Sequence, residues 1–181
     1  LMVEHVLRDV STVTDLSYCS LRYFNAAGAD MSADIGERHE PETHLIPLVL
    51  QVATGERESI KIIGEDYPTP DGTCLRDYIH VSDLTQAHLL ALESLMEGGD
   101  SATYNLGNST GYSVRQIIDS ARQITGHAIP AVMAERRAGD PAILIADSTR
   151  IREQLGWQPR FEKIDDIIDT AWTWHKKEAA G

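Results

Sequence analysis

Apolar residues return every three or four positions along several stretches of this chain, a spacing that places them on one face of a helix. Between these stretches lie short runs rich in β-branched and aromatic residues, which are typical of strands. The pattern predicts helices over residues 1–13, 44–54, 82–96, 113–125, 148–155 and 164–177, and strands over residues 20–24, 59–63, 102–106 and 128–133.

Residues suited to capping stand at the ends of two of these helices. Ser113 and Gln116 have the spacing of a capping box, in which each side chain accepts a hydrogen bond from the backbone N–H of the other residue. Gly126 is placed to end the same helix, because glycine adopts the left-handed conformation of a helix terminus at little cost. Ser82 and Asp83 are expected to cap the helix over residues 82–96.

Strands and helices alternate along the chain, which indicates an α/β fold with parallel strands. No linker, repeat or shift in composition divides the sequence, so we expect residues 1–181 to form a single α/β unit. The predicted strands make up only part of a parallel sheet, and the chain begins at Leu1 inside a predicted helix. We therefore expect this unit to be a piece of a larger protein.

Charge and composition narrow the classes of function. A net charge of −12 argues against nucleic acid and anionic membranes as partners, because both need a basic surface. No apolar run approaches the length of a membrane span, and the two cysteines, Cys19 and Cys74, make no disulfide framework, so we expect a cytoplasmic protein. A small anionic ligand is compatible with the charge, because a few well-placed arginines outweigh a distant acidic surface.

Polar residues follow the predicted strand over residues 20–24. Ligands of open α/β sheets bind beyond the carboxyl ends of the strands, where the side chain of Asn25 would meet them. An amide is suited to a phosphate oxygen or a sugar hydroxyl. A turn shaped by Asn25 and Gly28 explains the same residues without any ligand.

Two further segments concentrate charged residues. In residues 71–83, Arg76 is suited to fork onto a diphosphate with Asp77 supporting it, while the alternative is an internal ion pair with His80 as a buried, hydrogen-bonded histidine. Residues 135–141 contain two arginines, a glycine and an aspartate, a set that can hold a phosphate and a ribose together. A solvated charged loop is the alternative for this third segment.

Other kinds of site find little support in the sequence. The seven histidines show no pair at metal-ligand spacing, so we expect no metal site. Trp157, Trp172 and Trp174 lie in or near the terminal helices and are expected to pack in the interior. No Gly-rich phosphate loop follows an N-terminal strand, and no Ser/His/Asp or Cys/His arrangement is visible.

Taken together and in this order, the segments resemble the nucleotide-sugar epimerases of the extended short-chain dehydrogenase family. They are most similar to the UDP-galactose 4-epimerases, in the C-terminal, substrate-binding half of those enzymes. The resemblance covers essentially the whole chain, and its most specific part is the Tyr-Pro-Thr-x-Asp-Gly-Thr run that starts at Tyr67. The residues that carry it are Leu21 to Ala29, Asp66 to Asp83, Tyr104 to Gly107, Arg136 to Asp140 and Leu155 to Trp157.

The resemblance implies the C-terminal part of an NAD(P)-binding Rossmann-like fold, with a substrate-binding subdomain and the last strands and helices of the parallel sheet. It also implies an isomerase of galactose metabolism. The family oxidises C4 of a UDP-hexose with tightly bound NAD and returns the hydride to the other face of the sugar. The parent protein is expected to be a homodimer.

Twelve positions match the family's ligand contacts. Phe24 and Tyr23 lie where the nicotinamide end of NAD approaches. Leu144 falls where some members carry a tyrosine that closes the sugar pocket, so the intact protein is expected to accept N-acetylated UDP-hexoses as well. The resemblance implies diphosphate contacts from Asn25, Arg76 and Arg137, a ribose contact from Asp140, a strand along the uracil at Lys61, Ile62 and Ile63, and further substrate contacts from His44, Leu45 and Leu144.

The chain departs from the family in two motifs. The Gly-rich NAD loop and the Tyr-x-x-x-Lys catalytic pair do not occur in it. We therefore expect no catalytic residue in this chain, no NAD held by it alone and no epimerase activity. Two alternatives stay open, namely a stand-alone UDP-sugar-binding module and a fragment of a related nucleotide-sugar epimerase or dehydratase.

Overall fold

Six helices and nine strands make up residues 1–180, the part of the chain that this computed structural model describes. The helices are α1 (Met2–Ser11), α2 (Leu45–Ala53), α3 (Val81–Met96), α4 (Val114–Thr125), α5 (Thr149–Leu155) and α6 (Ile164–Ala180). The strands are β1 (Cys19–Arg22), β2 (Asn25–Ala27), β3 (Ile60–Ile63), β4 (Leu75–Arg76), β5 (Tyr78–His80), β6 (Ala102–Asn105), β7 (Tyr112–Ser113), β8 (Ala131–Ala134) and β9 (Ile143–Leu144).

All six predicted helices and all four predicted strands are confirmed, with ends displaced by a few residues. Five further strands, β2, β4, β5, β7 and β9, were not predicted. Each has only two or three residues, which is too short to show the alternation of apolar and polar positions that marks a strand. Of the helices within residues 1–180, none has both the length and the apolar character that a membrane crossing needs.

Parallel pairing dominates, as the alternation of elements predicts. β1 pairs with β6, β2 with β5 and β3 with β8, each in parallel, and β4 lies between antiparallel β7 and parallel β9. Within residues 1–180 the strands form four small sheets, so the described chain contains only part of a parallel sheet, as predicted. The chain passes from one sheet to the next between β1 and β2, where it bends at Phe24.

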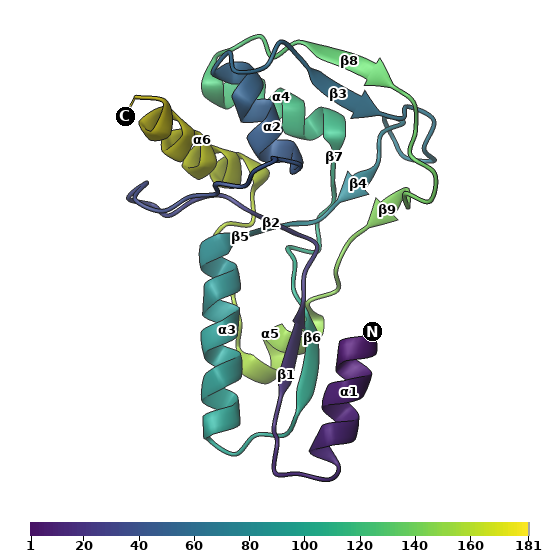
Figure 1. Ribbon diagram of the computed structural model, residues 1–181, viewed down its shortest axis with the longest axis vertical. Coiled ribbons are helices and arrows are strands. Elements are labelled where there is room, and N and C mark those ends of the chain that lie inside the picture. The colour runs from purple at the N-terminus through teal and green to yellow at the C-terminus, as the bar shows by residue number, and fades with distance from the viewer. Residues whose placement is uncertain (181) are drawn as a thin grey trace.

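Two hydrophobic clusters lie at opposite ends of the molecule (Figure 1). In the larger, α2, α4 and α6 pack together beside β3 and β8, with Leu50, Ile117 and Ile167 fully buried at the contact. In the smaller, α3 and α5 enclose β1 and β6 around Trp157, which has no exposed surface. β2 and β5 connect the two ends. α1 flanks β1 and β6 and buries none of its residues.

The ends of α4 form as the sequence predicts. Ser113 Oγ accepts a hydrogen bond from the backbone N–H of Gln116, and Gln116 Oε1 accepts one from the backbone N–H of Ser113. Gly126 ends the helix in the left-handed conformation. The expected cap of α3 is wrong: its cap is His80, whose Nδ1 accepts a hydrogen bond from the backbone N–H of Ser82.

His80 is the buried, hydrogen-bonded histidine of the structural alternative. Its Nε2 lies 3.0 Å from Thr170 Oγ1, and its ring stacks on that of Phe161 at 3.8 Å between centroids. A Cβ atom on Gly28 would lie 2.4 Å from His80 Cδ2, so only glycine lets β2 end against this ring. His80 therefore ties β2, α3 and α6 together.

Burial lowers the pKa of His80 below its ordinary value, so the folded chain holds the ring neutral. The unfolded chain takes up a proton as the pH falls through about 6.5, and the folded chain does so only at lower pH. The free energy of unfolding is therefore expected to fall between about pH 7.5 and about pH 5.5. Urea denaturation at both values measures the change.

His80→Gln is expected to make that pH dependence shallower, because one group with a depressed pKa is lost. Part of the dependence remains, since burial also lowers the pKa of His175. The matched control is His88→Gln on the exposed side of α3. An unchanged difference between the two pH values in His80→Gln would contradict the assignment.

Candidate functional site

A cavity of about 430 Å³ gathers residues from every candidate segment of the sequence. Its walls come from β2, the start of α2, β3, β4, β5 and the loop after β8. These elements are far apart along the chain, so folding alone brings them together. Eight of the ten predicted substrate-binding residues line it: Asn25, His44, Leu45, Lys61, Ile63, Arg76, Arg137 and Asp140.

The other two predicted residues lie outside the lining. Ile62 is 4% exposed and packs in the larger hydrophobic cluster, because successive side chains of a strand point to opposite faces. Leu144 pairs with Arg76 in the ladder between β4 and β9 but does not line the cavity. The side chain of Ile62 is therefore not placed to contact a ligand in this cavity, and its backbone faces β8 in the ladder.

Eight lining residues were missed by the sequence analysis. Some had no signal, such as Arg57 in the turn before β3. For others the sequence did contain a signal. Tyr78 stands two positions after Arg76 in an extended segment, and because side chains alternate along such a segment, both lie on the same side of it. The missed residues are Thr43, Leu48, Arg57, Ser59, Ile60, Cys74, Tyr78 and Val114.

Arg76 is held in place by carbonyl groups. Its Nη1 donates to the backbone oxygens of Leu75 at 2.8 Å and Pro141 at 2.9 Å. Within residues 1–180 it forms no ion pair with a carboxylate. A guanidinium that is oriented by neutral oxygens keeps its charge available to an anionic ligand.

The two adjacent arginines of the third segment point to different surroundings. Arg136 lies over the ring of Tyr67, 4.0 Å from its centroid, and 3.9 Å from a carboxylate oxygen of Asp66. Arg137 lines the cavity and forms no ion pair in the described part of the chain. Both arginines are exposed, as the alternative of a solvated charged loop expects, and the contact of Arg137 with a ligand stays a prediction.

The cavity is cationic although the protein is acidic. Arg57, Lys61, Arg76 and Arg137 line it together with a single carboxylate, that of Asp140. Burial raises the pKa of the Tyr78 phenol, so Tyr78 adds a neutral hydroxyl to the wall. The cavity therefore suits an anionic ligand with polar groups, in a chain whose net charge is −12.

Asn25 and β3 contribute uncharged polar groups. Asn25 Nδ2 donates to the backbone oxygen of Asp77 at 2.7 Å, which fixes the amide at the cavity wall. β3 is hydrogen-bonded to β8 along one edge, and no strand of residues 1–180 pairs with its other edge. Backbone N–H and C=O groups of Lys61 and Ile63 are therefore available along that edge.

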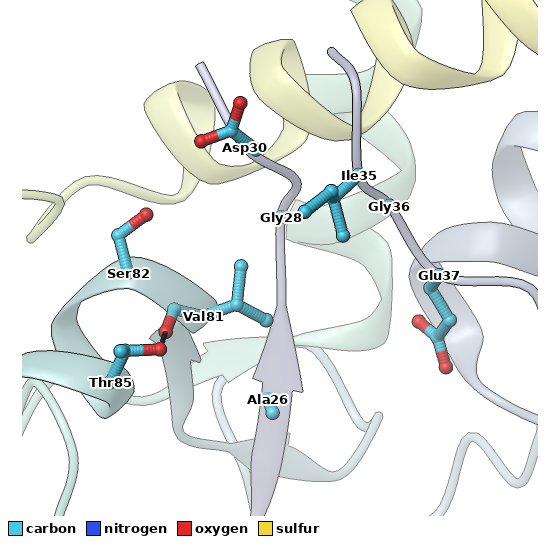
Figure 2. Close-up of a pocket in the computed structure, with 9 residues that line it drawn as sticks. All are labelled: Ala26, Gly28, Asp30, Ile35, Gly36, Glu37, Val81, Ser82 and Thr85. Atoms are coloured by element: carbon cyan, nitrogen blue, oxygen red, sulfur yellow. Dashed lines mark hydrogen bonds between the residues drawn. The ribbon is translucent and has the colours of Figure 1, made fainter. Parts of the chain in front are cut away.

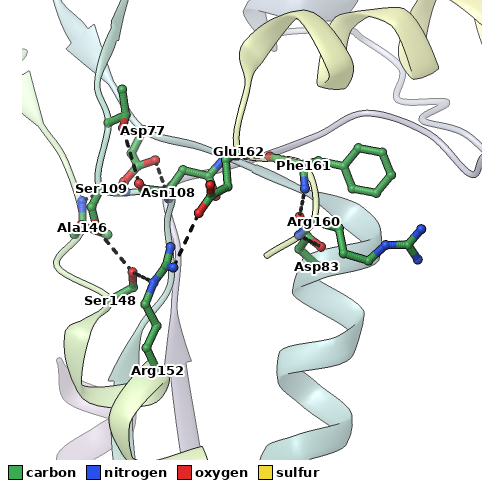
Figure 3. A network of polar contacts seen from close by, with 11 residues as sticks. Asp77, Asp83, Asn108, Ser109, Ala146, Ser148, Arg152, Arg160, Phe161 and Glu162 are labelled. Carbon is green, nitrogen blue, oxygen red and sulfur yellow. Dashed lines mark hydrogen bonds and ion pairs between the residues drawn. The ribbon is translucent and has the colours of Figure 1, made fainter. Parts of the chain in front are cut away.

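Asp77, between Arg76 and Tyr78, does not line the cavity, and its carboxylate lies against Asn108 and Ser109 (Figure 3). Its carboxylate accepts hydrogen bonds from the backbone N–H groups of Asn108 at 3.0 Å, Ser109 at 3.2 Å and Ala146 at 3.1 Å. Burial raises the pKa of this carboxyl group, and the three hydrogen bonds oppose that shift. Asp77 therefore neither supports the Arg76 guanidinium directly nor forms the internal ion pair of the alternative.

The network extends on both sides of Asp77 (Figure 3). Ser109 and Arg152 both contact the hydroxyl of Ser148, and Arg152 lies 3.5 Å from a carboxylate oxygen of Glu162. Nearby, the buried carboxylate of Asp83 accepts hydrogen bonds from the backbone N–H groups of Arg160 and Phe161. These bonds hold the loop after β6 and the loop before α6 against the strands that carry the cavity.

A second hollow, of about 550 Å³, lies at the N-terminus of α3 (Figure 2). Ala26 of β2 lines it, whereas the preceding Asn25 lines the cationic cavity, so β2 separates the two. Asp30 and Ser82 contribute polar groups to its lining. None of the predicted ligand residues reaches it.

The two predicted cofactor residues lie at the carboxyl end of β1. Tyr23 and Phe24 are each 45% exposed, and neither lines the cationic cavity. Their rings offer apolar surface beside it. At this place the described part of the chain presents an open surface, on which both rings face solvent.

Comparisons with known proteins agree with this geometry. Residues 1–107 match the family model described as the NAD dependent epimerase/dehydratase family. A UDP-glucose 4-epimerase of Halalkalibacterium halodurans is 51% identical over 181 residues, which are all of this chain and 54% of that protein. The chain thus spans about half the length of the curated relatives it matches. That this is their C-terminal half stays a prediction.

Solved structures share the fold. A crystal structure of a UDP-glucose 4-epimerase superposes with a TM-score of 0.95 at 55% identity, over 99% of this chain and 55% of that one. The UDP-glucose 4-epimerase of Bifidobacterium longum in complex with NAD⁺ and UDP gives a TM-score of 0.91 at 38% identity, over 98% of this chain and 53% of that one. The fold is therefore that of an NAD-dependent epimerase of Rossmann-like α/β architecture, of which this chain represents about half.

Asp77→Asn is expected to lower the free energy of unfolding by about 3 kcal/mol, because an NH₂ group would replace one of the acceptor oxygens and leave buried N–H groups unpaired. Urea denaturation at neutral pH measures the loss. Asp169→Asn, an exposed carboxylate on α6, is the matched control and should change stability by less than about 0.5 kcal/mol. Equal effects of the two substitutions would refute the role of Asp77.

Proposed function

Because the chain belongs to the NAD dependent epimerase/dehydratase family, we propose that it is the UDP-hexose-binding half of a UDP-glucose/UDP-galactose 4-epimerase. The observation that carries the proposal is the cationic cavity. Two arginines without carboxylate partners, an oriented asparagine and an open strand edge meet in it, from segments spread over the chain. The names of the relatives and the ligands in their structures support the same substrate class.

Each part of a UDP-hexose has matching groups in this cavity. The diphosphate would contact Arg76 and Arg137, whose guanidinium groups are suited to phosphate oxygens. The uracil would lie along the open edge of β3, where backbone groups can hydrogen-bond to its carbonyl and N–H groups. Asp140 would accept a hydrogen bond from a ribose hydroxyl, and Asn25 would donate to a phosphate or sugar oxygen.

The chemical step needs groups that this chain does not provide. NAD supplies the hydride acceptor at C4 of the sugar in this family, and a base must take the hydroxyl proton at the same time. Tyr23 and Phe24 present ring surface suited to the nicotinamide, but no Gly-rich phosphate loop is present in the sequence to hold the dinucleotide. We propose that the remainder of the parent protein holds NAD and supplies the base. The exposed apolar residues of α1 support such a covering partner.

A stand-alone UDP-sugar-binding module is the second candidate. The cavity favours it, because all its walls come from this chain and binding alone needs nothing more. The two functions differ in one respect: only a half of an epimerase yields turnover when the missing half is restored.

Arg137→Ala is expected to weaken UDP binding about tenfold to a hundredfold, because a charge-assisted hydrogen bond to a phosphate is lost. Isothermal titration of UDP into the 181-residue chain measures the change. The adjacent Arg136→Ala is the matched control, since Arg136 contacts Tyr67 and Asp66 instead of the cavity. Equal losses in both variants, or UDP binding no tighter than uridine binding, would refute the diphosphate site.

The chain alone is expected to leave UDP-galactose unchanged in the presence of NAD, because the family's Tyr-x-x-x-Lys catalytic pair does not occur in it. Chromatography of UDP-galactose and UDP-glucose after long incubation measures the conversion. The same preparation must bind UDP, which shows that it is folded. Adding the NAD-binding half of a related epimerase is expected to restore turnover, and binding without turnover in that mixture would favour the stand-alone module.

A further inference from the structure

A cluster of two histidines and two glutamates lies in the loop that leads into α2. Three possible ligand atoms, one each from His39, Glu42 and His44, all lie within 4.8 Å of one another. His44 Nδ1 is 2.7 Å from Glu37 Oε1 and 2.9 Å from Glu42 Oε1, and His39 Nδ1 is 3.9 Å from Glu42 Oε1. We propose that His39, Glu42 and His44, with Glu37 as a fourth ligand, bind a zinc-class divalent cation.

The distances suit such an ion. Ligand atoms at about 2.1 Å from a tetrahedral zinc ion lie roughly 3.4 Å apart, and the observed separations of 2.7, 2.9 and 3.9 Å lie on both sides of that value. The ion would lie between His44 Nδ1 and the two carboxylates that now approach it. Only small side-chain movements would be needed, and imidazole and carboxylate are ligands that zinc accepts.

One ligand is already fixed by the backbone. Glu42 Oε1 accepts hydrogen bonds from the N–H groups of Thr43 and His44, each at 2.7 Å, and its side chain is only 7% exposed. Outer contacts of this kind orient a metal ligand before the ion arrives. His39 and His44 are half exposed, so an ion can reach them from solvent.

The surroundings also favour a cation. Glu37, His39 and Glu42 line a cavity of about 520 Å³ whose other charged side chains include Glu56 and Glu178. One arginine, Arg38, lines the cavity in the described part of the chain, and its guanidinium pairs with Glu178. The cavity is thus acidic, in contrast to the cationic one on the other side of the loop.

The cluster stands between these two cavities. His44 lines the cationic cavity, and the other three residues line the acidic one. A bound ion would fix the segment before α2, whose residues Leu45 and Leu48 also wall the cationic cavity. Titration of the ion in the absence of UDP measures ion binding by itself, so this proposal and the proposed function can fail or succeed separately.

The test is a titration of ZnCl₂ into the 181-residue chain, prepared without an affinity tag and followed by calorimetry. One ion per chain is expected. His39→Ala and Glu42→Gln should each weaken binding by at least roughly tenfold, because a ligand is lost. The matched controls are His5→Ala on α1 and Glu40→Gln in the same loop, which should leave the affinity unchanged.

Far-UV circular dichroism of each variant without metal shows whether it is folded. His39→Ala removes an exposed side chain, so it decides the matter if Glu42→Gln fails to fold. Co²⁺ in place of Zn²⁺ gives a second readout, since tetrahedral coordination by nitrogen and oxygen produces visible absorption bands. Absence of zinc binding, or equal affinity in His39→Ala and His5→Ala, would overturn the proposal.

Discussion

The buried carboxylate of Asp77 is the constraint on which the binding cavity depends. It stands in an extended segment between Arg76 and Tyr78, and it draws three backbone N–H groups from two distant loops onto its two oxygens. Because side chains alternate along such a segment, fixing Asp77 on one side fixes its two neighbours on the other. A Cβ atom on Gly107 would lie 2.3 Å from Asp77 Oδ2, so only glycine at this position leaves room for the carboxylate.

Local charge and net charge have opposite signs in this protein. The chain carries a net charge of −12, yet the cavity that we propose for UDP-hexose is lined by four cationic side chains and one carboxylate. Charges near a ligand act over a few ångströms, whereas surface charges farther away are screened by salt. On the far side of the loop before α2, glutamates and histidines gather around a second cavity. Two neighbouring cavities therefore differ in the sign of the charges that line them.

Residues 71–83 combine features of the functional and the structural interpretation, and the diphosphate contact of Arg76 stays a prediction. Arg76 does face the cavity, as the ligand interpretation predicts, while His80 is the buried histidine of the structural one. The idea that Asp77 holds Arg76 was wrong, because backbone carbonyls of Leu75 and Pro141 do so. A carboxylate next to an arginine in sequence points to the opposite face of an extended segment, so adjacency alone argued against that pair.

Local features of this protein were determined by its sequence. Periodicity placed the six helices, the capping box of Ser113 and Gln116 formed, and the family motifs pointed to eight of the sixteen residues that line the cavity. Tertiary structure alone decided that Arg57 and Tyr78 line the cavity, that Ile62 faces the core, and that His39, Glu42 and His44 converge. The reason is physical: helices and caps depend on bonds between residues a few positions apart, whereas a side chain's neighbours depend on packing between segments that are distant in the chain.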